Sequence, residues 1–227
     1  MMNWKIFKRH WEPLEILLMI TMVLVTIASV IVKQAVIRVM PLYVSMVISL
    51  LLSRVNRYAY LLGGINSIAY GFIALYYKIP GSAINAFCFS FPLQILSFIR
   101  WSRSAWKNTT ILKKMTLRGR ALNLLLLLGG GCGYYFVIRA LGSASSLIDA
   151  AASLLGIYIT ILQLLKYSEY TYLMIPSGLM TISLYISLMA KGNMEQFPFL
   201  VYACFSLLCS IRAVGQVRLI LKAQKAT

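Results

Sequence analysis

Acidic side chains and histidine are scarce in this sequence. Five Asp and Glu residues stand against 22 Lys and Arg in 227 residues, and the single histidine is His10. Acid–base catalysis and metal binding both need several such side chains close together, so we expect no enzyme, no metal site and no cofactor. The cysteines have no Cys-x-x-Cys spacing, which argues against a zinc site and a disulfide framework. All four lie in apolar stretches: Cys88, Cys132, Cys204 and Cys209.

Charge of either sign is also low. Only 12% of the residues are charged and 60% are hydrophobic, with a mean hydropathy of +0.81. Soluble domains are about half apolar and about a quarter charged, and a chain of this length cannot bury so much apolar surface in one core. The composition therefore predicts an all-α membrane protein, and it excludes soluble enzymes and nucleic-acid-binding proteins.

Long apolar stretches recur along the whole chain. A helix that crosses the hydrocarbon core of a bilayer needs roughly 20 mostly apolar residues. We therefore predict eight transmembrane helices, at Leu14–Val32, Val36–Leu52, Tyr58–Tyr77, Ala83–Ile99, Ala121–Ile138, Leu147–Leu165, Tyr172–Met189 and Phe197–Val217.

Cations are distributed unevenly between the two ends of these spans. With eight spans, 17 of the 22 Lys and Arg residues fall on the side of the N-terminus. Cytoplasmic loops collect Lys and Arg, so both termini are predicted to be cytoplasmic. The stretch Arg100–Arg120 holds seven cations and no acid. We interpret it as a loop lying along anionic lipid headgroups, rather than as a nucleic-acid-binding segment.

The chain matches itself weakly at one offset of 112 residues. Arg54 falls on Lys166, Tyr58 on Tyr170 and Arg100 on Arg212. The offset covers four spans, so we predict two parallel three-helix repeats joined by a linker helix (3+1+3), with one extra N-terminal helix. Transporters with such repeats bind substrate at the repeat interface. The predicted units are residues 1–35 (extra helix), 36–104 (first repeat), 105–146 (basic loop and linker) and 147–227 (second repeat and tail).

Helix-breaking residues occur inside several of these spans. Pro41, Pro92 and Pro176 each remove a backbone hydrogen bond and favour kinks, and we predict a flexible or unwound point at Pro176–Gly178. The run Gly129–Gly133 lacks the following Lys-Ser/Thr of a phosphate loop, so we assign it to close helix packing.

Neutral polar side chains inside the spans are the candidates for substrate binding. Buried amides must find hydrogen-bond partners, either on other helices or on a ligand, and both readings stay open for each residue. Asn66 shares a helix face with Tyr70, as Gln94 does with Phe91. Asp149, at the outer end of the sixth span, is suited to capping or to ligand contact. The predicted substrate-binding residues are Asn66, Tyr70, Asn85, Phe91, Gln94, Asp149, Gln163, Tyr172, Ser177 and Tyr185.

Three segments resemble the first repeat of the PnuC-type vitamin transporters. They are Tyr60–Tyr70 (YLLGGINSIAY), Phe91–Gln94 (FPLQ) and Arg100–Arg103 (RWSR), and the order of elements matches over residues 36–217. The resemblance implies a fold similar to that of the SWEET sugar transporters. It also implies a homotrimer in the bacterial cytoplasmic membrane that carries nicotinamide riboside, or a related nucleoside-like vitamin, by facilitated diffusion. A cytoplasmic kinase would then trap the substrate by phosphorylation.

The second repeat departs from that family pattern. Where nicotinamide riboside carriers resemble Trp-x-x-Trp-x-x-x-Asn, this chain has Thr171–Gly178 (TYLMIPSG), and Ile148 stands at a further Trp position. Loss of these indoles removes the best cation–π partners for a pyridinium ring, which favours a deoxynucleoside or thiamin over nicotinamide riboside. Two alternatives remain: a sugar carrier of the SWEET kind, and a non-transporting membrane subunit that binds a partner through its basic loop.

Overall fold

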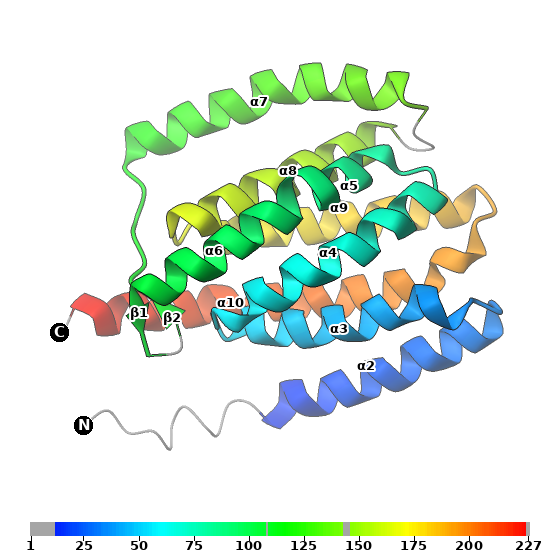
Figure 1. Cartoon of the computed structure of the whole chain (residues 1–227), viewed down its shortest axis with the longest axis horizontal. Helices are drawn as coiled ribbons and strands as arrows, with labels where there is room; N and C mark the ends of the chain where they lie inside the picture. The colour runs from blue at the N-terminus through cyan, green and yellow to red at the C-terminus, as the bar shows by residue number, and fades with distance from the viewer. Residues whose placement is uncertain (1–11, 108, 143–145, 226–227) are drawn as a thin grey trace.

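The computed structural model describes residues 12–107, 109–142 and 146–225, and these are almost entirely helical (Figure 1). Helices lie over all eight predicted ranges. They are α2 (Glu12–Ile31), α3 (Val36–Ser53), α4 (Tyr58–Tyr76), α5 (Pro80–Ile84) continuing through η1 (Asn85–Ser90) into α6 (Phe91–Arg103), α7 (Leu117–Ala140), α8 (Ser146–Leu165), α9 (Tyr170–Ala190) and α10 (Phe197–Lys225).

Two short elements were not predicted. The basic segment between α6 and α7 contains an antiparallel hairpin of β1 (Ala105–Trp106) and β2 (Thr109–Thr110). A 3-10 turn, η2 (Met194–Gln196), precedes α10.

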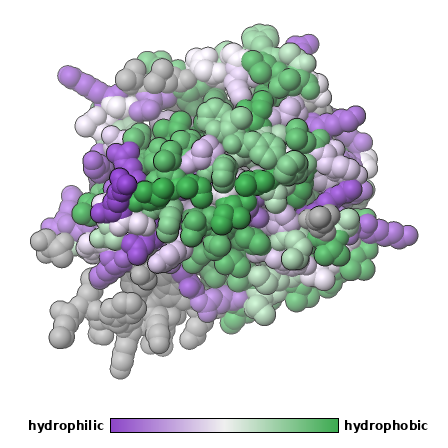
Figure 2. All heavy atoms as spheres, in the orientation of Figure 1, coloured by the Kyte–Doolittle hydropathy of each residue, from purple (hydrophilic) through white to green (hydrophobic). Residues whose placement is uncertain are grey.

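Several of these helices are long and apolar enough to cross a membrane. Within the described residues, six meet that condition by length and composition, and α3 is apolar but shorter over Arg38–Ser53. Helix α7 is not among the six. Figure 2 shows an apolar band between two hydrophilic ends, as expected of a surface that contacts lipid. The structure thus supports a membrane protein with multiple helical spans.

The helices pack as two trios. Helix α4 lies between α3 and α6, and α9 lies between α8 and α10. The trios meet crosswise, because α3 packs on α10 and α6 packs on α8. Helix α2 covers α3 and α10 from outside, and α7 lies along the edge of the bundle against α8 (Figure 1).

Proline has different effects at the three predicted positions. Pro41 and Pro176 lie inside the continuous helices α3 and α9. The prediction of an unwound point at Pro176–Gly178 is therefore wrong, since one missing N–H does not unwind a helix that is packed on both sides. Pro92 follows the π-helical turn η1 at the start of α6. The span predicted over Ala83–Ile99, with a kink expected at Pro92, thus contains a π-helical turn just before that proline.

The glycine run of α7 does not pack closely against another helix, contrary to the prediction. A Cβ added at Gly129, Gly130 or Gly133 would meet nothing within 4 Å. Only at Gly131 would a Cβ meet a neighbour, Leu154 of α8 at 3.2 Å. Helix α7 packs mainly on α8, and most of this glycine face remains open.

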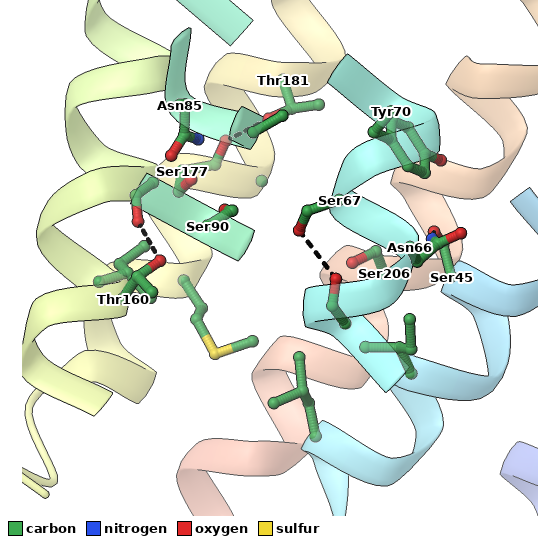
Figure 3. A pocket seen from close by; sticks show the side chains of 18 of the residues that line it. Ser45, Asn66, Ser67, Tyr70, Asn85, Ser90, Thr160, Ser177, Thr181 and Ser206 are labelled. Atoms are coloured by element: carbon green, nitrogen blue, oxygen red, sulfur yellow. Dashed lines mark hydrogen bonds between the residues drawn. The ribbon is translucent and has the colours of Figure 1, made fainter. Parts of the chain in front are cut away.

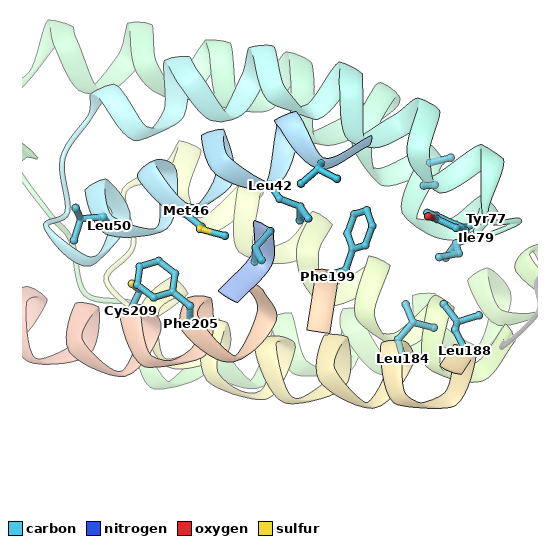
Figure 4. Packing of buried hydrophobic residues seen from close by; sticks show 14 of the residues in the cluster. Leu42, Met46, Leu50, Tyr77, Ile79, Leu184, Leu188, Phe199, Phe205 and Cys209 are labelled. Atoms are coloured by element: carbon cyan, nitrogen blue, oxygen red, sulfur yellow. The ribbon is translucent and has the colours of Figure 1, made fainter. Parts of the chain in front are cut away.

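Buried apolar side chains form two clusters. The larger joins α3, α9 and α10, with Leu42, Met46, Leu184, Phe199 and Phe205 among its members (Figure 4). The second lies near the hairpin and centres on Trp101, Tyr60 and Tyr170. A polar cavity lies between the two trios of helices.

Candidate functional site

The cavity has a volume of about 370 Å³ and is lined by both trios. This is within the range of small-molecule sites, roughly 300–1,000 Å³. Side chains from α3, α4 and α10 face side chains from η1, α8 and α9 across it (Figure 3). The site therefore lies at the interface of the two helix groups.

Seven of the ten predicted substrate-binding residues line this cavity. They come from five elements that are distant in sequence, which only the tertiary fold brings together. The seven are Asn66, Tyr70, Asn85, Gln94, Gln163, Ser177 and Tyr185.

The other three predicted residues lie elsewhere. Phe91 does not line the cavity and is 37% exposed. Tyr172 is 44% exposed and lines a different pocket, near the end of α10. Asp149 is completely buried behind the cavity wall.

Asp149 caps the start of a neighbouring helix. Its carboxylate accepts hydrogen bonds from the backbone N–H groups of Gly81 and Ser82, at 3.0 and 3.1 Å, and from the Ser82 hydroxyl at 3.0 Å. Those N–H groups open α5 and have no partner within their own helix. The capping role considered from the sequence is therefore present, but it joins the two trios rather than capping the helix that carries Asp149.

Asn66 holds α4 against α3 and also faces the cavity. Its side-chain Nδ2 donates to the carbonyl of Pro41 at 3.1 Å and to the Ser45 hydroxyl at 2.6 Å. Nothing in the described part of the chain donates to its side-chain oxygen. Asn66 therefore fits both roles considered from the sequence: its side-chain nitrogen joins two helices, and its side-chain oxygen remains available to a ligand.

Two other amides rest directly against glycines. A Cβ added at Gly63 would lie 2.0 Å from the Gln94 Oε1 atom, and one added at Gly156 would lie 2.6 Å from the Asn85 Nδ2 atom. No real side chain tolerates such contacts, so each glycine provides the space for its amide. Asn85 Oδ1 and Tyr70 Oη are buried and find no hydrogen-bond partner among the described residues. Buried polar atoms are normally paired, so these two atoms favour a polar ligand.

Hydroxyl side chains form much of the remaining wall, and the sequence analysis missed most of them. Ser and Thr are common in spans, so single residues carried no signal. Tyr202, Ser206 and Ser210 are spaced four residues apart and share one face of α10; that pattern was readable. The hydroxyl-bearing wall includes Ser45, Ser67, Ser82, Ser90, Thr160, Thr181, Tyr202, Ser206 and Ser210.

Gln196 is a further polar residue that the sequence did not predict as part of the site. It is completely buried, and neither atom of its amide has a hydrogen-bond partner. It lines a small cavity of about 60 Å³ whose walls include Tyr70, Ser82 and Tyr185, which also line the larger cavity. The small cavity therefore adjoins the main one.

Polar contacts hold the bundle at both ends of the site. Near the hairpin, the Trp101 indole donates to the carbonyl of Gln163 at 2.7 Å, which joins α6 to α8. At the opposite end, Glu195 accepts from Arg38 at 2.8 Å and from the Tyr77 hydroxyl at 3.1 Å. The cavity is thus bounded at each end by contacts between different helices.

The cavity walls are polar but uncharged. Its described lining contains no Lys, Arg, His, Asp or Glu, and no group of three His, Cys, Asp or Glu within the described ranges is placed to hold a metal ion. Such a wall suits a neutral or weakly charged molecule with several hydrogen-bonding groups. Its described lining offers no cationic partner for a phosphate.

Comparison with known proteins gives concordant matches. The family model described as "Nicotinamide mononucleotide transporter" matches residues 35–214. The chain is 26% identical over 157 residues to the nicotinamide riboside transporter PnuC of Neisseria mucosa, covering 65% of this chain and 60% of that protein. It is also similar to the crystal structure of the vitamin B3 transporter PnuC, with a TM-score of 0.80, 19% identity and 92% of each chain covered. At that identity the structural match establishes the fold.

Proposed function

This chain belongs to the PnuC-type family of nicotinamide mononucleotide transporters, as its residues predict, and we propose that it carries a nucleoside-like vitamin across a membrane. It is a transporter rather than an enzyme. Nicotinamide riboside is the leading candidate substrate. The observation that carries the proposal is the uncharged polar cavity at the interface of the two helix trios.

The cavity wall is suited to the parts of a riboside. Serine and threonine hydroxyls supply donors and acceptors for sugar hydroxyls. Tyr70, Tyr185 and Tyr202 place aromatic rings in the same wall. Tyrosine faces attract cations and stack on flat rings, as a nicotinamide or another heterocycle requires. A wall that carries both hydroxyls and aromatic rings therefore suits a ring joined to a sugar.

The charge of the wall distinguishes a nucleoside from a nucleotide. A phosphate buried without Lys, Arg or another cation would lose its hydration with no opposite charge to balance its own, which is unfavourable even where hydroxyls donate hydrogen bonds. The described lining holds no cation. We therefore propose that the substrate is the riboside, although the family description names the mononucleotide.

The identity of the ring depends on the second repeat. Thr171, Met174 and Gly178 stand at the Trp, Trp and Asn positions of the Trp-x-x-Trp-x-x-x-Asn pattern. Met174 and Gly178 line the cavity. Thr171 is buried, and its hydroxyl donates to the carbonyl of Ser168. The aromatic clamp is absent at these sites, which supports thymidine-like deoxynucleosides or thiamin as the second candidates. The named relative supports nicotinamide riboside.

We propose that transport is uniport followed by trapping. Proton pumps move protons through ionisable side chains inside the membrane. The described cavity wall contains no pair of carboxylates that could do this. Net uptake would then depend on a cytoplasmic kinase that phosphorylates the substrate.

The chain spans about 60% of the length of the curated relative it matches.

The membrane arrangement is also a proposal. We propose eight spans, with α3, α4 and α6 forming one repeat, α8, α9 and α10 the other, α7 the linker and α2 the extra helix. The domain limits are those given above. The start of α2 and the end of α10 lie at the same side of the molecule (Figure 1). This supports two cytoplasmic termini in a bacterial inner membrane. Assembly as a homotrimer is proposed from the family resemblance alone.

Uptake into liposomes that contain only this protein tests the function. Radiolabelled nicotinamide riboside, thymidine and thiamin are supplied outside, each with the other two and a free sugar as competitors. We expect saturable equilibration of nicotinamide riboside without any ion gradient, and no uptake of the mononucleotide. Selective uptake of thymidine or thiamin would replace the ring assignment, and competition by sugar alone would favour a SWEET-like carrier. No uptake of any compound would contradict the proposed function.

A further inference from the structure

A second cavity of about 370 Å³ lies at the end of the molecule that carries the β-hairpin. It is formed where the end of α10 meets the start of α9, the loop before α7 and the first turn of α7. Its described lining holds five cations: Lys114, Arg120, Arg218, Lys222 and Lys225.

The three cations of α10 share one face of the helix. Arg218, Lys222 and Lys225 are spaced by four and three residues, so successive side chains lie above one another. They all follow the predicted span Phe197–Val217, on the part of α10 that continues beyond it. The helix extension therefore presents a row of positive charge to the cavity.

A single carboxylate, Glu169, offsets these cations in the cavity wall. Its Oε1 atom accepts from the Arg120 guanidinium at 2.6 Å and from the backbone N–H of Met115 at 3.1 Å, and its Oε2 atom accepts from the Ser168 hydroxyl. Glu169 thus neutralises Arg120 and has both oxygens occupied. The wall keeps an excess of four positive charges.

Arg218 is held in place without being neutralised. Its Nε atom donates to the Tyr172 hydroxyl at 3.2 Å, and its guanidinium carbon lies 5.6 Å from the centre of the Tyr172 ring. These contacts orient a planar fork of donors, the geometry with which arginine binds phosphate groups. In the described ranges, Lys114, Lys222 and Lys225 form no ion pair.

Further cations lie close to this end of the molecule, around Lys166. Burial, and then the proximity of Arg100 and Lys113, lower the pKa of Lys166. Lys166 directly follows α8. Its backbone carbonyl accepts a hydrogen bond from the backbone N–H of Lys113, the residue before Lys114. Repulsion of this kind is relieved when an anion binds.

We propose that this basic pocket binds a phosphate group. Arg218 and Lys222 form its centre, with Lys114 and Lys225 as further partners. Two sources share that chemistry: the phosphodiester of an anionic lipid headgroup and a soluble phosphate. Basic pockets between helices at the cytoplasmic side bind such headgroups. The site is separate from the transport cavity, so the proposal does not depend on the substrate.

The test uses the full chain in nanodiscs of phosphatidylcholine, alone or mixed with phosphatidylglycerol, followed by mass spectrometry of the retained lipid. The test variant is Arg218→Gln with Lys222→Gln. The matched control, Lys33→Gln with Lys78→Gln, removes the same charge from exposed lysines at the opposite end. We expect the parent and the control to retain phosphatidylglycerol and to gain thermal stability from it, and the test variant to lose most of both effects.

Two further measurements separate the sources and control for folding. Displacement of phosphatidylglycerol by millimolar inorganic phosphate, or stabilisation of the protein by phosphate in phosphatidylcholine discs, would assign the site to soluble phosphate. No effect of phosphate would assign it to the lipid. The charge-preserving variant Arg218→Lys with Lys222→Arg should retain binding. Equal retention of phosphatidylglycerol and equal response to phosphate in the test variant and the control would overturn the proposal.

Discussion

Gly63 of α4 and the side-chain amide of Gln94 on α6 occupy adjoining space at the cavity wall. A Cβ on Gly63 would lie 2.0 Å from the Gln94 Oε1 atom. The position of the amide in the site therefore depends on the absence of a side chain at residue 63. A change at Gly63 therefore alters the position of the Gln94 amide in the cavity wall.

The first prediction concerns Gly63→Ala. The added methyl must displace the Gln94 amide, which lies at the end of a flexible side chain and can turn away at little cost in stability. We expect liposome uptake to fall by roughly tenfold, the effect of losing one hydrogen bond of about 1.4 kcal/mol to the substrate. Gly129→Ala is the matched control, because nothing lies within 4 Å of its added Cβ. If both variants transport equally, Gln94 has no part in binding.

The second prediction concerns Asp149. Replacement by Ala leaves the buried N–H of Gly81 and the half-buried N–H of Ser82 without their acceptor, at a cost of about 1–3 kcal/mol for the buried group. We expect a lower unfolding temperature of the purified protein by circular dichroism. Asp149→Asn keeps one acceptor oxygen and should lose less. An unchanged midpoint for Asp149→Ala would contradict the capping role.

The third prediction concerns Trp101→Phe. This change keeps a ring in the aromatic cluster but removes the indole N–H that donates to the Gln163 carbonyl. We expect a loss of stability of about 1–2 kcal/mol, and weaker coupling between α6 and α8. Trp106→Phe, at a half-buried hairpin residue, is the control and should change little. A Trp101→Phe protein as stable as this control would show that the indole hydrogen bond is not structural.

The fourth prediction concerns Gln196→Leu. Both polar atoms of Gln196 are buried and unpaired, so an apolar side chain of similar size should leave stability unchanged or raise it. We nevertheless expect slower uptake, because the small cavity adjoins the transport site. Parallel measurement of unfolding and uptake separates the two effects. Unaltered uptake would assign the small cavity to packing alone.

The fifth prediction concerns pH. The described walls of the transport cavity contain no Asp, Glu, His, Lys or Arg, so nothing there changes charge between about pH 5 and 8. The initial uptake rate of a substrate that does not itself titrate should be constant over that range. A proton gradient across the liposome should likewise have no effect. A rate that follows the gradient would point to coupling through another group.

The sequence by itself determined the class of protein, the helices and the family. These follow from quantities that are local along the chain: apolar stretches of spanning length, cations at their ends and short motifs. Helices lie over all eight predicted ranges because backbone polar groups in lipid must be satisfied within each segment. Asn66, Asn85 and Gln94 were identifiable because amides are rare and unfavourable in such stretches.

Only the tertiary structure decided which polar side chains meet. Asp149 was readable as a cap, but its partner is 68 residues away on α5. Tyr172 and Ser177 lie on the same helix, yet only Ser177 reaches the cavity. The unpaired amide of Gln196 and the basic pocket around Arg218 could not be predicted from the sequence either, because both depend on which helices lie side by side. Hydrogen bonds and cavities depend on distances between helices, which the contacts of the folded bundle set and which local patterning does not encode.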